Sequence, residues 1–157
     1  MSRVTPESGS IARVRRYVIE KTARSSAEPG TVYGLLRDGA TWPVWGPIDT
    51  FELEREGYGE PEGVGAIRVF VRGRTRGRDE VVGFAADRQF RYNHIEGLPV
   101  RDYRGVIDLV PRDSGTEITW TVSFSAKYPG TGWLLRPALD RFVGTCVTGL
   151  AEHAATA

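Results

Sequence analysis

The feature that most constrains the fold is a change in the spacing of apolar residues along the chain. Between residues 49 and 126 apolar residues recur at every second position, which is typical of half-buried strands. After Gly130 the spacing becomes helical. We therefore predict six consecutive antiparallel strands and then one long helix over residues 137–155. The last strand and the helix carry the clearest stripes, which are Ile118, Trp120, Val122 and Phe124, then Leu135, Leu139, Phe142, Cys146 and Leu150.

The chain before residue 49 adds one strand and two short helices to this prediction. Residues 13–24 have the composition of a strand. A polar helix start at residues 26–28 precedes apolar residues at helical spacing up to Gly39, and a second short helix holds Trp42 and Trp45. A one-sided sheet must bury its apolar face. We therefore expect an α+β fold in which a curved, seven-stranded antiparallel sheet wraps around the long C-terminal helix.

Length and composition restrict the domain organisation and the function classes. The 157 residues suffice for one domain, which we place at residues 13–157 after a flexible arm at residues 1–12. A net charge of +1 gives no indication of nucleic-acid binding. The chain lacks the roughly 18 consecutive apolar residues of a membrane span and the apolar core of a signal peptide, so we expect a cytoplasmic protein. The single Cys146 excludes an internal disulfide.

Several segments resemble the START, polyketide cyclase/dehydrase and pollen-allergen superfamily (SRPBCC), and in particular its polyketide cyclase/dehydrase branch. The similarity extends over about residues 13–155. The segments that carry it are residues 41–47 (TWPVWGP), 56–57 with 63–65 (EG and GVG), 93–99 with Tyr103 (NHIEGLP), and 114–120 (SGTEITW). The resemblance implies the helix-grip fold, with a cavity between sheet and helix that accepts polyketides, lipids or other largely apolar molecules.

The inward-predicted positions agree with such a cavity, because they carry many large aromatic side chains. Each of these rings could equally fill an ordinary core. The candidate ligand-binding residues are Trp45, Phe51, Phe84, Phe90, Tyr92, Tyr103, Trp120, Phe124, Leu139, Phe142 and Cys146.

Four residues are candidates for proton transfer or for stabilising an enolate. His94 shares the strand parity of Phe90 and Tyr92, so it faces the cavity if they do, or it is hydrogen-bonded at the cavity rim. Glu80 shares the parity of Phe84; it either pairs with an arginine such as Arg68 or lies at a solvated strand end. The hydroxyls of Tyr92 and Tyr103 could donate to a ligand, or to main-chain groups or water.

For two further sequence features we prefer a structural interpretation to a functional one. Five arginines around one hairpin, at positions 68, 72, 74, 76 and 78, form either an electropositive rim or a solvated hairpin whose charges block edge pairing. The glycine-rich segment 57–65 lacks a nucleotide-loop ending and precedes a strand, which indicates a tight β-connection. Ligand clusters with metal-binding spacing are missing from the sequence, so we expect no metal and no cofactor.

The sequence leaves three functions open. The first is binding of a small hydrophobic or aromatic molecule with catalysis of its cyclisation or dehydration, as in an aromatase/cyclase. The second is a carrier or sensor that binds such a molecule without reaction. The third is a protein-interaction module that uses the sheet surface. In each case we expect a monomer or a homodimer without a nucleic-acid partner.

Overall fold

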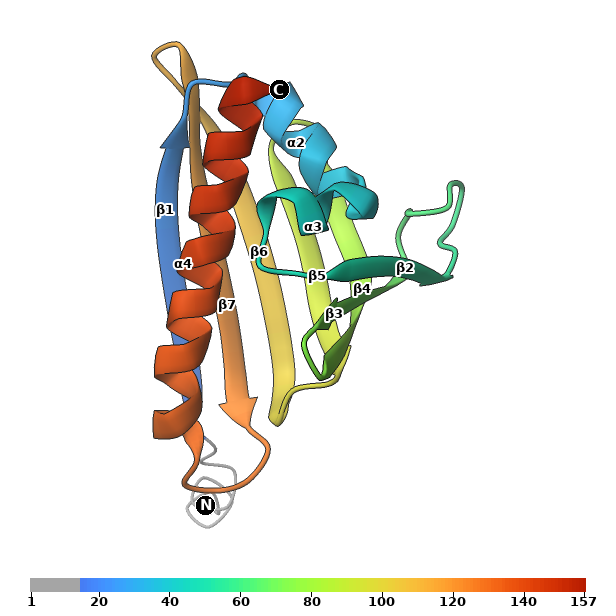
Figure 1. The fold of residues 1–157 in the computed structure, drawn as a ribbon, viewed down its shortest axis with the longest axis vertical. Coiled ribbons are helices and arrows are strands. Elements are labelled where there is room, and N and C mark those ends of the chain that lie inside the picture. The colour runs from blue at the N-terminus through green and yellow to red at the C-terminus, as the bar shows by residue number, and fades with distance from the viewer. Residues whose placement is uncertain (1–14) are drawn as a thin grey trace, which may run out of the picture.

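Seven antiparallel strands form one sheet that curves around a long C-terminal helix in the computed structural model of the protein, which describes residues 15–157 (Figure 1). The expected helix-grip architecture is confirmed. The N-terminal arm expected at residues 1–12 lies outside the described residues. The strands are β1 (Arg16–Ser25), β2 (Thr50–Arg55), β3 (Ile67–Arg72), β4 (Thr75–Ala85), β5 (Gln89–Glu96), β6 (Val100–Arg112) and β7 (Gly115–Ala126), and the helices are α2 (Pro29–Arg37), the 3-10 turn η1 (Gly39–Thr41), α3 (Trp42–Trp45) and α4 (Gly132–Thr156).

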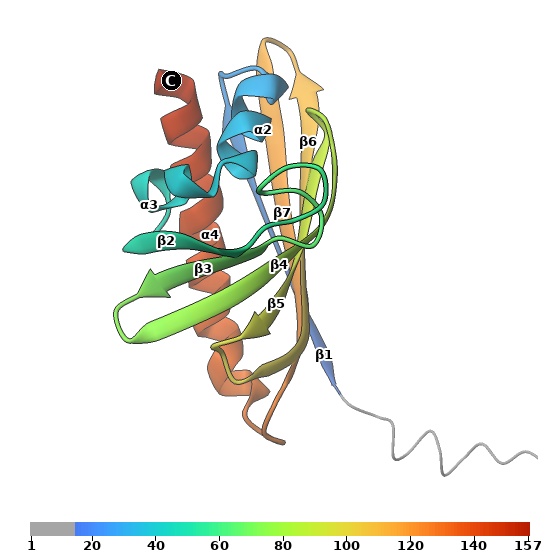
Figure 2. The same ribbon diagram turned by 90° about the vertical axis from the view of Figure 1, so that its right-hand side faces the viewer.

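The strand order in the sheet is β1-β7-β6-β5-β4-β3-β2, so β2 to β7 form a run of hairpins and β1 closes the far edge against β7. The segment from α2 to α3 connects β1 to β2, the two outermost strands. Figure 2 shows these short helices on the same side of the sheet as α4. The concave face is therefore covered by α4 along one side and by α2 and α3 at one end.

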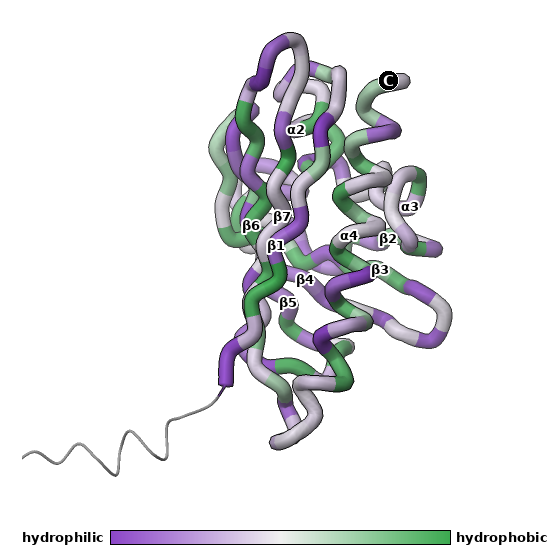
Figure 3. Tube along the Cα trace, turned by 90° about the vertical axis from the view of Figure 1, so that its left-hand side faces the viewer, coloured by the Kyte–Doolittle hydropathy of each residue, from purple (hydrophilic) through white to green (hydrophobic). Residues whose placement is uncertain are grey.

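The core lies between this concave face and the helices. The predicted inner face of β7 is confirmed, because Ile118, Trp120, Val122 and Phe124 are all at most 1% exposed. Figure 3 shows hydrophobic and hydrophilic residues interleaved along the strands and along α4. Two members of the α4 stripe, Leu135 and Phe142, are only partly buried.

The predicted start of the long helix differs from the structure. The helix begins at Gly132, five residues before the predicted start, and contains Pro137. Pro137 has no N–H to donate to the carbonyl of Trp133, so one helical hydrogen bond is missing there. Trp133 is 68% exposed, and the helix tolerates the proline at this position.

Candidate functional site

An internal cavity of 220 Å³ lies between the concave face of the sheet and the N-terminal half of α4. The strands β3 to β7 contribute one wall, and Leu135, Leu139 and Phe142 of α4 contribute the other. Leu135 and Phe142, the two partly buried members of the helix stripe, border this space together with the buried Leu139. Six aromatic residues contribute to the lining, namely Trp42, Phe70, Tyr92, Tyr103, Trp120 and Phe142.

A hydrogen-bonded carboxylate and imidazole form the polar part of the cavity. His94 Nδ1 lies 2.8 Å from Asp79 Oδ1, and His94 Nε2 accepts the backbone N–H of Leu98 at 3.1 Å. Because Nε2 acts as an acceptor, the imidazole is neutral and carries its hydrogen on Nδ1, which donates to Asp79. Both ring nitrogens are thus engaged by the protein. His94 faces the cavity, as predicted, and it is also hydrogen-bonded at the rim.

The carboxylate in the cavity belongs to Asp79, where the strand parity predicts Glu80. The reason is a β-bulge in β4: Val81 pairs with Tyr92 and Gly83 pairs with Arg91, so Val82 is an extra residue. The bulge reverses the alternation between Phe84, which lies opposite Phe90, and the residues before it.

Glu80 consequently lies on the other face of the sheet. Its side chain is 36% exposed and forms an ion pair with Arg55 at 3.6 Å. Glu80 thus pairs with an arginine, as one of the two alternatives has it, but the partner is Arg55 and not Arg68. The inward orientation expected from the strand parity is not observed.

The two candidate tyrosines lie in the cavity wall with their hydroxyl groups protonated. Burial raises the pKa of Tyr92 well above its usual range and also raises the pKa of Tyr103. The hydroxyl of Tyr92 accepts a hydrogen bond from Trp120 Nε1 at 3.1 Å. The hydroxyl of Tyr92 is also hydrogen-bonded to that of Tyr103. The hydroxyl of Tyr103 retains a hydrogen that can be donated to a ligand.

The other residues predicted to bind a ligand divide into two groups. Trp120, Leu139 and Phe142 line the cavity together with Tyr92 and Tyr103. The remaining six lie beside it, in the surrounding core or at a surface groove, and their role in binding stays a prediction. These six are Trp45, Phe51, Phe84, Phe90, Phe124 and Cys146.

Several lining residues were not among the predicted site residues, and those with an aromatic ring or a charge are Trp42, Phe70, Arg72 and Asp79. Trp42 belongs to the segment that carries the family resemblance, and its ring stacks on Phe70 at 4.9 Å between centroids. The resemblance could have identified Trp42. The orientation of Phe70 had no clear signal, since β3 is buried on both faces over four residues.

Arg68 departs from the interpretation of the arginines as a solvated hairpin. It is 1% exposed and donates to the carbonyl oxygens of Leu36 and Arg37 at 3.0 and 2.7 Å. Glu62 of the glycine-rich segment lies 2.8 Å from its guanidinium. Burial lowers the pKa of Arg68 to about 10. Arg68 therefore attaches β3 and the glycine-rich segment to the end of α2.

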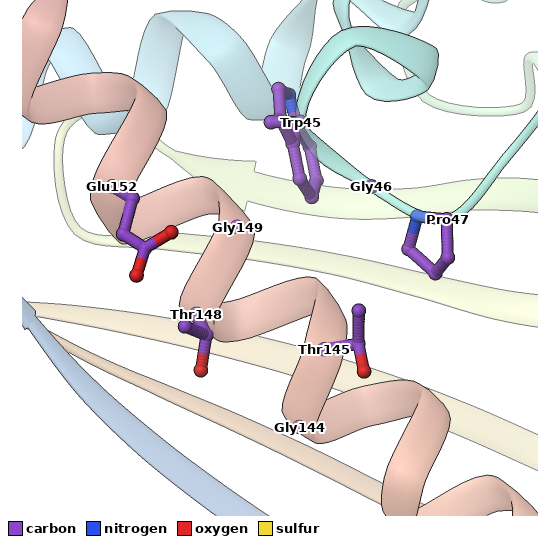
Figure 4. A pocket seen from close by; sticks show the side chains of 8 residues that line it. All are labelled: Trp45, Gly46, Pro47, Gly144, Thr145, Thr148, Gly149 and Glu152. Atoms are coloured by element: carbon purple, nitrogen blue, oxygen red, sulfur yellow. The ribbon is translucent and has the colours of Figure 1, made fainter.

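A second concavity is a surface groove of 510 Å³ between α3 and α4, where Trp45 and Pro47 face the helix (Figure 4). A Cβ atom at Gly149 would overlap the carbonyl oxygen of Trp45, so the glycine permits this close approach. Trp45 is the only aromatic residue lining the groove, and Glu152 the only charged one. We place the candidate site in the internal cavity, where aromatic walls and the Asp79–His94 pair occur together.

Residues 15–157 hold neither a metal-binding cluster nor a membrane-spanning helix. Groups of three His, Cys, Asp or Glu side chains close enough to hold a metal ion are not found there. Over the same residues, α4 and the shorter helices fall short of the length and hydropathy required to cross a membrane.

Three solved structures illustrate the similarity of the fold. Norcoclaurine synthase from Thalictrum flavum, in complex with dopamine and hydroxybenzaldehyde, is 16% identical with a TM-score of 0.72, over 99% of this chain and 94% of that chain. The Zhui aromatase/cyclase from Streptomyces sp. R1128 is 16% identical with a TM-score of 0.71, over 89% of this chain and 94% of that chain. The protein TTHA0849 from Thermus thermophilus is 20% identical with a TM-score of 0.68, over 89% of this chain and 98% of that chain. These similarities establish the fold.

A comparison with curated protein sequences finds no significant match. The family assignment comes from a sequence model, described as polyketide cyclase / dehydrase and lipid transport, which matches residues 16–156. The match runs from the first strand to the last turn of α4, and so includes every element that builds the cavity. The chain belongs to the polyketide cyclase / dehydrase and lipid transport family.

Proposed function

We propose that the protein binds a compact aromatic or apolar molecule in the internal cavity, with a hydrogen-bond donor of the ligand on Asp79. The observation that carries this proposal is the combination of a lining rich in aromatic residues with a single carboxylate–imidazole pair. Small-molecule sites are typically apolar pockets in which a few polar groups fix the ligand orientation. The family, whose members bind small hydrophobic ligands, supports the same function.

The size of the cavity favours a small ligand. Ligand pockets usually measure about 300–1,000 Å³, and an apolar cavity of about 150 Å³ is large enough for benzene. The 220 Å³ found here therefore fits one substituted ring better than a long polyketide or a lipid chain.

The second function that we propose is catalysis of cyclisation or dehydration, and the Asp79–His94 pair favours it. The free oxygen of Asp79 is in reach of the cavity and can accept a proton from a bound ligand. His94 is then a positioning residue, because its Nδ1–H holds the other oxygen of the same carboxylate. Tyr103 can donate a hydrogen bond to an oxygen that gains negative charge. The aromatase/cyclase and norcoclaurine synthase folds support this proposal by analogy.

The binding function is tested by filling the cavity. Leu139→Trp places a larger side chain in the space, and Leu134→Trp places the same side chain on the exposed face of the same helix. Binding of para-cresol to the wild-type protein is followed by calorimetry and by the fluorescence of Trp42 and Trp120, which line the cavity. We expect Leu139→Trp to weaken binding by about 10-fold or more and Leu134→Trp to leave it unchanged.

Equal affinity in the wild-type protein and in folded Leu139→Trp would contradict binding in this cavity. Catalysis is separated from transport by native mass spectrometry of the freshly purified protein. A co-purified aromatic molecule that stays chemically unchanged during incubation supports a carrier. Its conversion by the wild-type protein, and not by Asp79→Asn, supports an enzyme.

A further inference from the structure

We infer that the ligand is an aromatic carboxylate, with its anionic group bound by Arg72 at the mouth of the cavity and a hydroxyl or N–H donor bound by Asp79 in the interior. The inference rests on the proposed binding function and adds the chemical class of the ligand.

Arg72 is the basic group at the mouth of the cavity. It is the last residue of β3 and lies opposite Thr75 across the hairpin, and both residues line the cavity. The residue is exposed, and its guanidinium carbon lies 5.1 Å from the centroid of the Phe142 ring. A guanidinium stacked on an aromatic face keeps its in-plane N–H donors available. The stack therefore holds a planar, bidentate donor at the opening.

The positive charge of Arg72 has no protein counterion within residues 15–157. The other inward-facing arginine of β3, Arg68, is paired with Glu62. On β4, Arg76 lies 3.8 Å from Glu52, and Arg78 lies 2.7 Å from Glu54. Arg72 thus differs from its paired neighbours in that it borders the cavity without a carboxylate partner. A carboxylate of the ligand fits the bidentate geometry of a guanidinium.

The second polar group of the cavity fixes the orientation of the ligand. Thr75, which lies opposite Arg72, and Asp79 are four residues apart on the same face of β4, which corresponds to about 13 Å along the strand. The reverse orientation would place the ligand carboxylate beside Asp79, where two negative charges repel. Aromatic side chains line the cavity between these two ends.

The inference is tested with three probes of nearly equal size: para-hydroxyphenylpropionate, its neutral primary amide, and phenylpropionate. Calorimetry at low salt measures their affinities for the wild-type protein, Arg72→Gln, Arg74→Gln and Asp79→Asn. Arg74 lies in the same hairpin, but it does not line the cavity, so its variant controls for the overall charge. Glutamine keeps a polar side chain at an exposed position, so both hairpin variants are expected to fold.

We expect the wild-type protein to bind the hydroxylated acid about 10-fold more tightly than the amide, with a difference that shrinks at high salt. Arg72→Gln should remove this preference, and Arg74→Gln should keep it. Phenylpropionate should bind the wild-type protein about threefold more weakly than the hydroxylated acid, and Asp79→Asn should reduce that difference.

Three results would overturn the inference. Equal binding of the acid and the amide by the wild-type protein refutes an anionic ligand and leaves the binding function intact. The same loss of preference in Arg72→Gln and Arg74→Gln refutes a specific role for Arg72. If neither the acid nor the amide binds and para-cresol also fails to bind, then the proposed binding function is wrong as well.

Discussion

Trp120 donates its indole N–H to the hydroxyl of Tyr92 over 3.1 Å, and both side chains are buried in the wall of the cavity. This bond joins β7 to β5 across the intervening strand β6. It orients the phenol of Tyr92, whose hydroxyl is in turn hydrogen-bonded to that of Tyr103.

Removal of this acceptor should destabilise the protein. Tyr92→Phe leaves the buried N–H of Trp120 without its partner, and we expect the free energy of unfolding to fall by about 1–3 kcal/mol. Urea denaturation followed by circular dichroism measures the change. Tyr128→Phe, at a residue that is 56% exposed, is the control and should change stability by less than about 0.5 kcal/mol. Equal effects of the two variants would show that the Trp120–Tyr92 bond contributes nothing.

The hydrogen bonds of His94 predict its tautomer. Because Nε2 accepts from Leu98 and Nδ1 donates to Asp79, the ring should be the neutral Nδ1–H form at pH 7.5. Long-range proton–nitrogen correlation spectra distinguish the two tautomers. His153, the other histidine of the chain, lies in the last turn of α4 and should show averaged nitrogen shifts. An Nε2–H tautomer at His94 would disprove the hydrogen-bond arrangement on which the role of Asp79 depends.

Arg68 should be essential for stability although it lies outside the cavity. Arg68→Met removes a buried guanidinium that holds two carbonyl oxygens of α2 and the carboxylate of Glu62. We expect the free energy of unfolding to fall by about 3–5 kcal/mol, because the two carbonyl oxygens and the carboxylate of Glu62 would lose their hydrogen-bond and ion-pair partner. Arg74→Met, on the exposed hairpin, serves as the matched control. A well-folded Arg68→Met protein of wild-type stability would argue that the methionine packs as well as the ion pair.

Stability should fall at alkaline pH because of Cys146. Burial raises the pKa of this thiol from 9.0 to about 12, so between pH 9 and pH 10 the folded state retains a proton that the unfolded state loses. The contribution is complete below pH 9 and declines as the pH rises, by up to about 1.4 kcal/mol per pH unit. Tyr92 and Tyr103 act in the same direction from about pH 10, whereas the lowered pKa of Arg68 opposes them.

Cys146→Ser removes the titration and should make the free energy of unfolding less dependent on pH between pH 9 and pH 10. Urea titrations at several pH values in this range provide the comparison. The slope with pH, rather than the absolute stability, is the quantity to compare, because the hydroxyl has its own burial cost. Identical slopes in the two proteins would assign the alkaline destabilisation to other groups.

The fold could be predicted because its strongest signals are local. The alternation along β7 and the stripe of α4 identify the two surfaces that form the core, and each depends only on residues close in sequence. Asp87 and Asp113 adopt positive φ angles of 62° and 50° in the β4–β5 and β6–β7 turns, a conformation that aspartate tolerates.

The site was harder to predict because it depends on details that alternation does not encode. Parity identifies the face of a strand but not the position along it, so Phe90 and Phe124 could not be distinguished from the cavity-lining Tyr92 and Trp120. In β3, the apolar Ile67 and Val69 occupy one face and the buried Arg68 occupies the other. Neither face is exposed there, so alternation cannot show which face points into the cavity. The sequence carries no mark of the bulge at Val82, and so Asp79 was missed.

The bulge at Val82 makes β4 two short strands of opposite phase joined at one residue. If β4 kept all its residues but paired without the bulge, and Phe84 kept its place, the residues before Val82 would turn over relative to those after it. The cavity would then receive Glu80, whose side chain is one methylene longer, instead of Asp79. A backbone irregularity at a residue outside the cavity lining thus decides which acidic group the site contains.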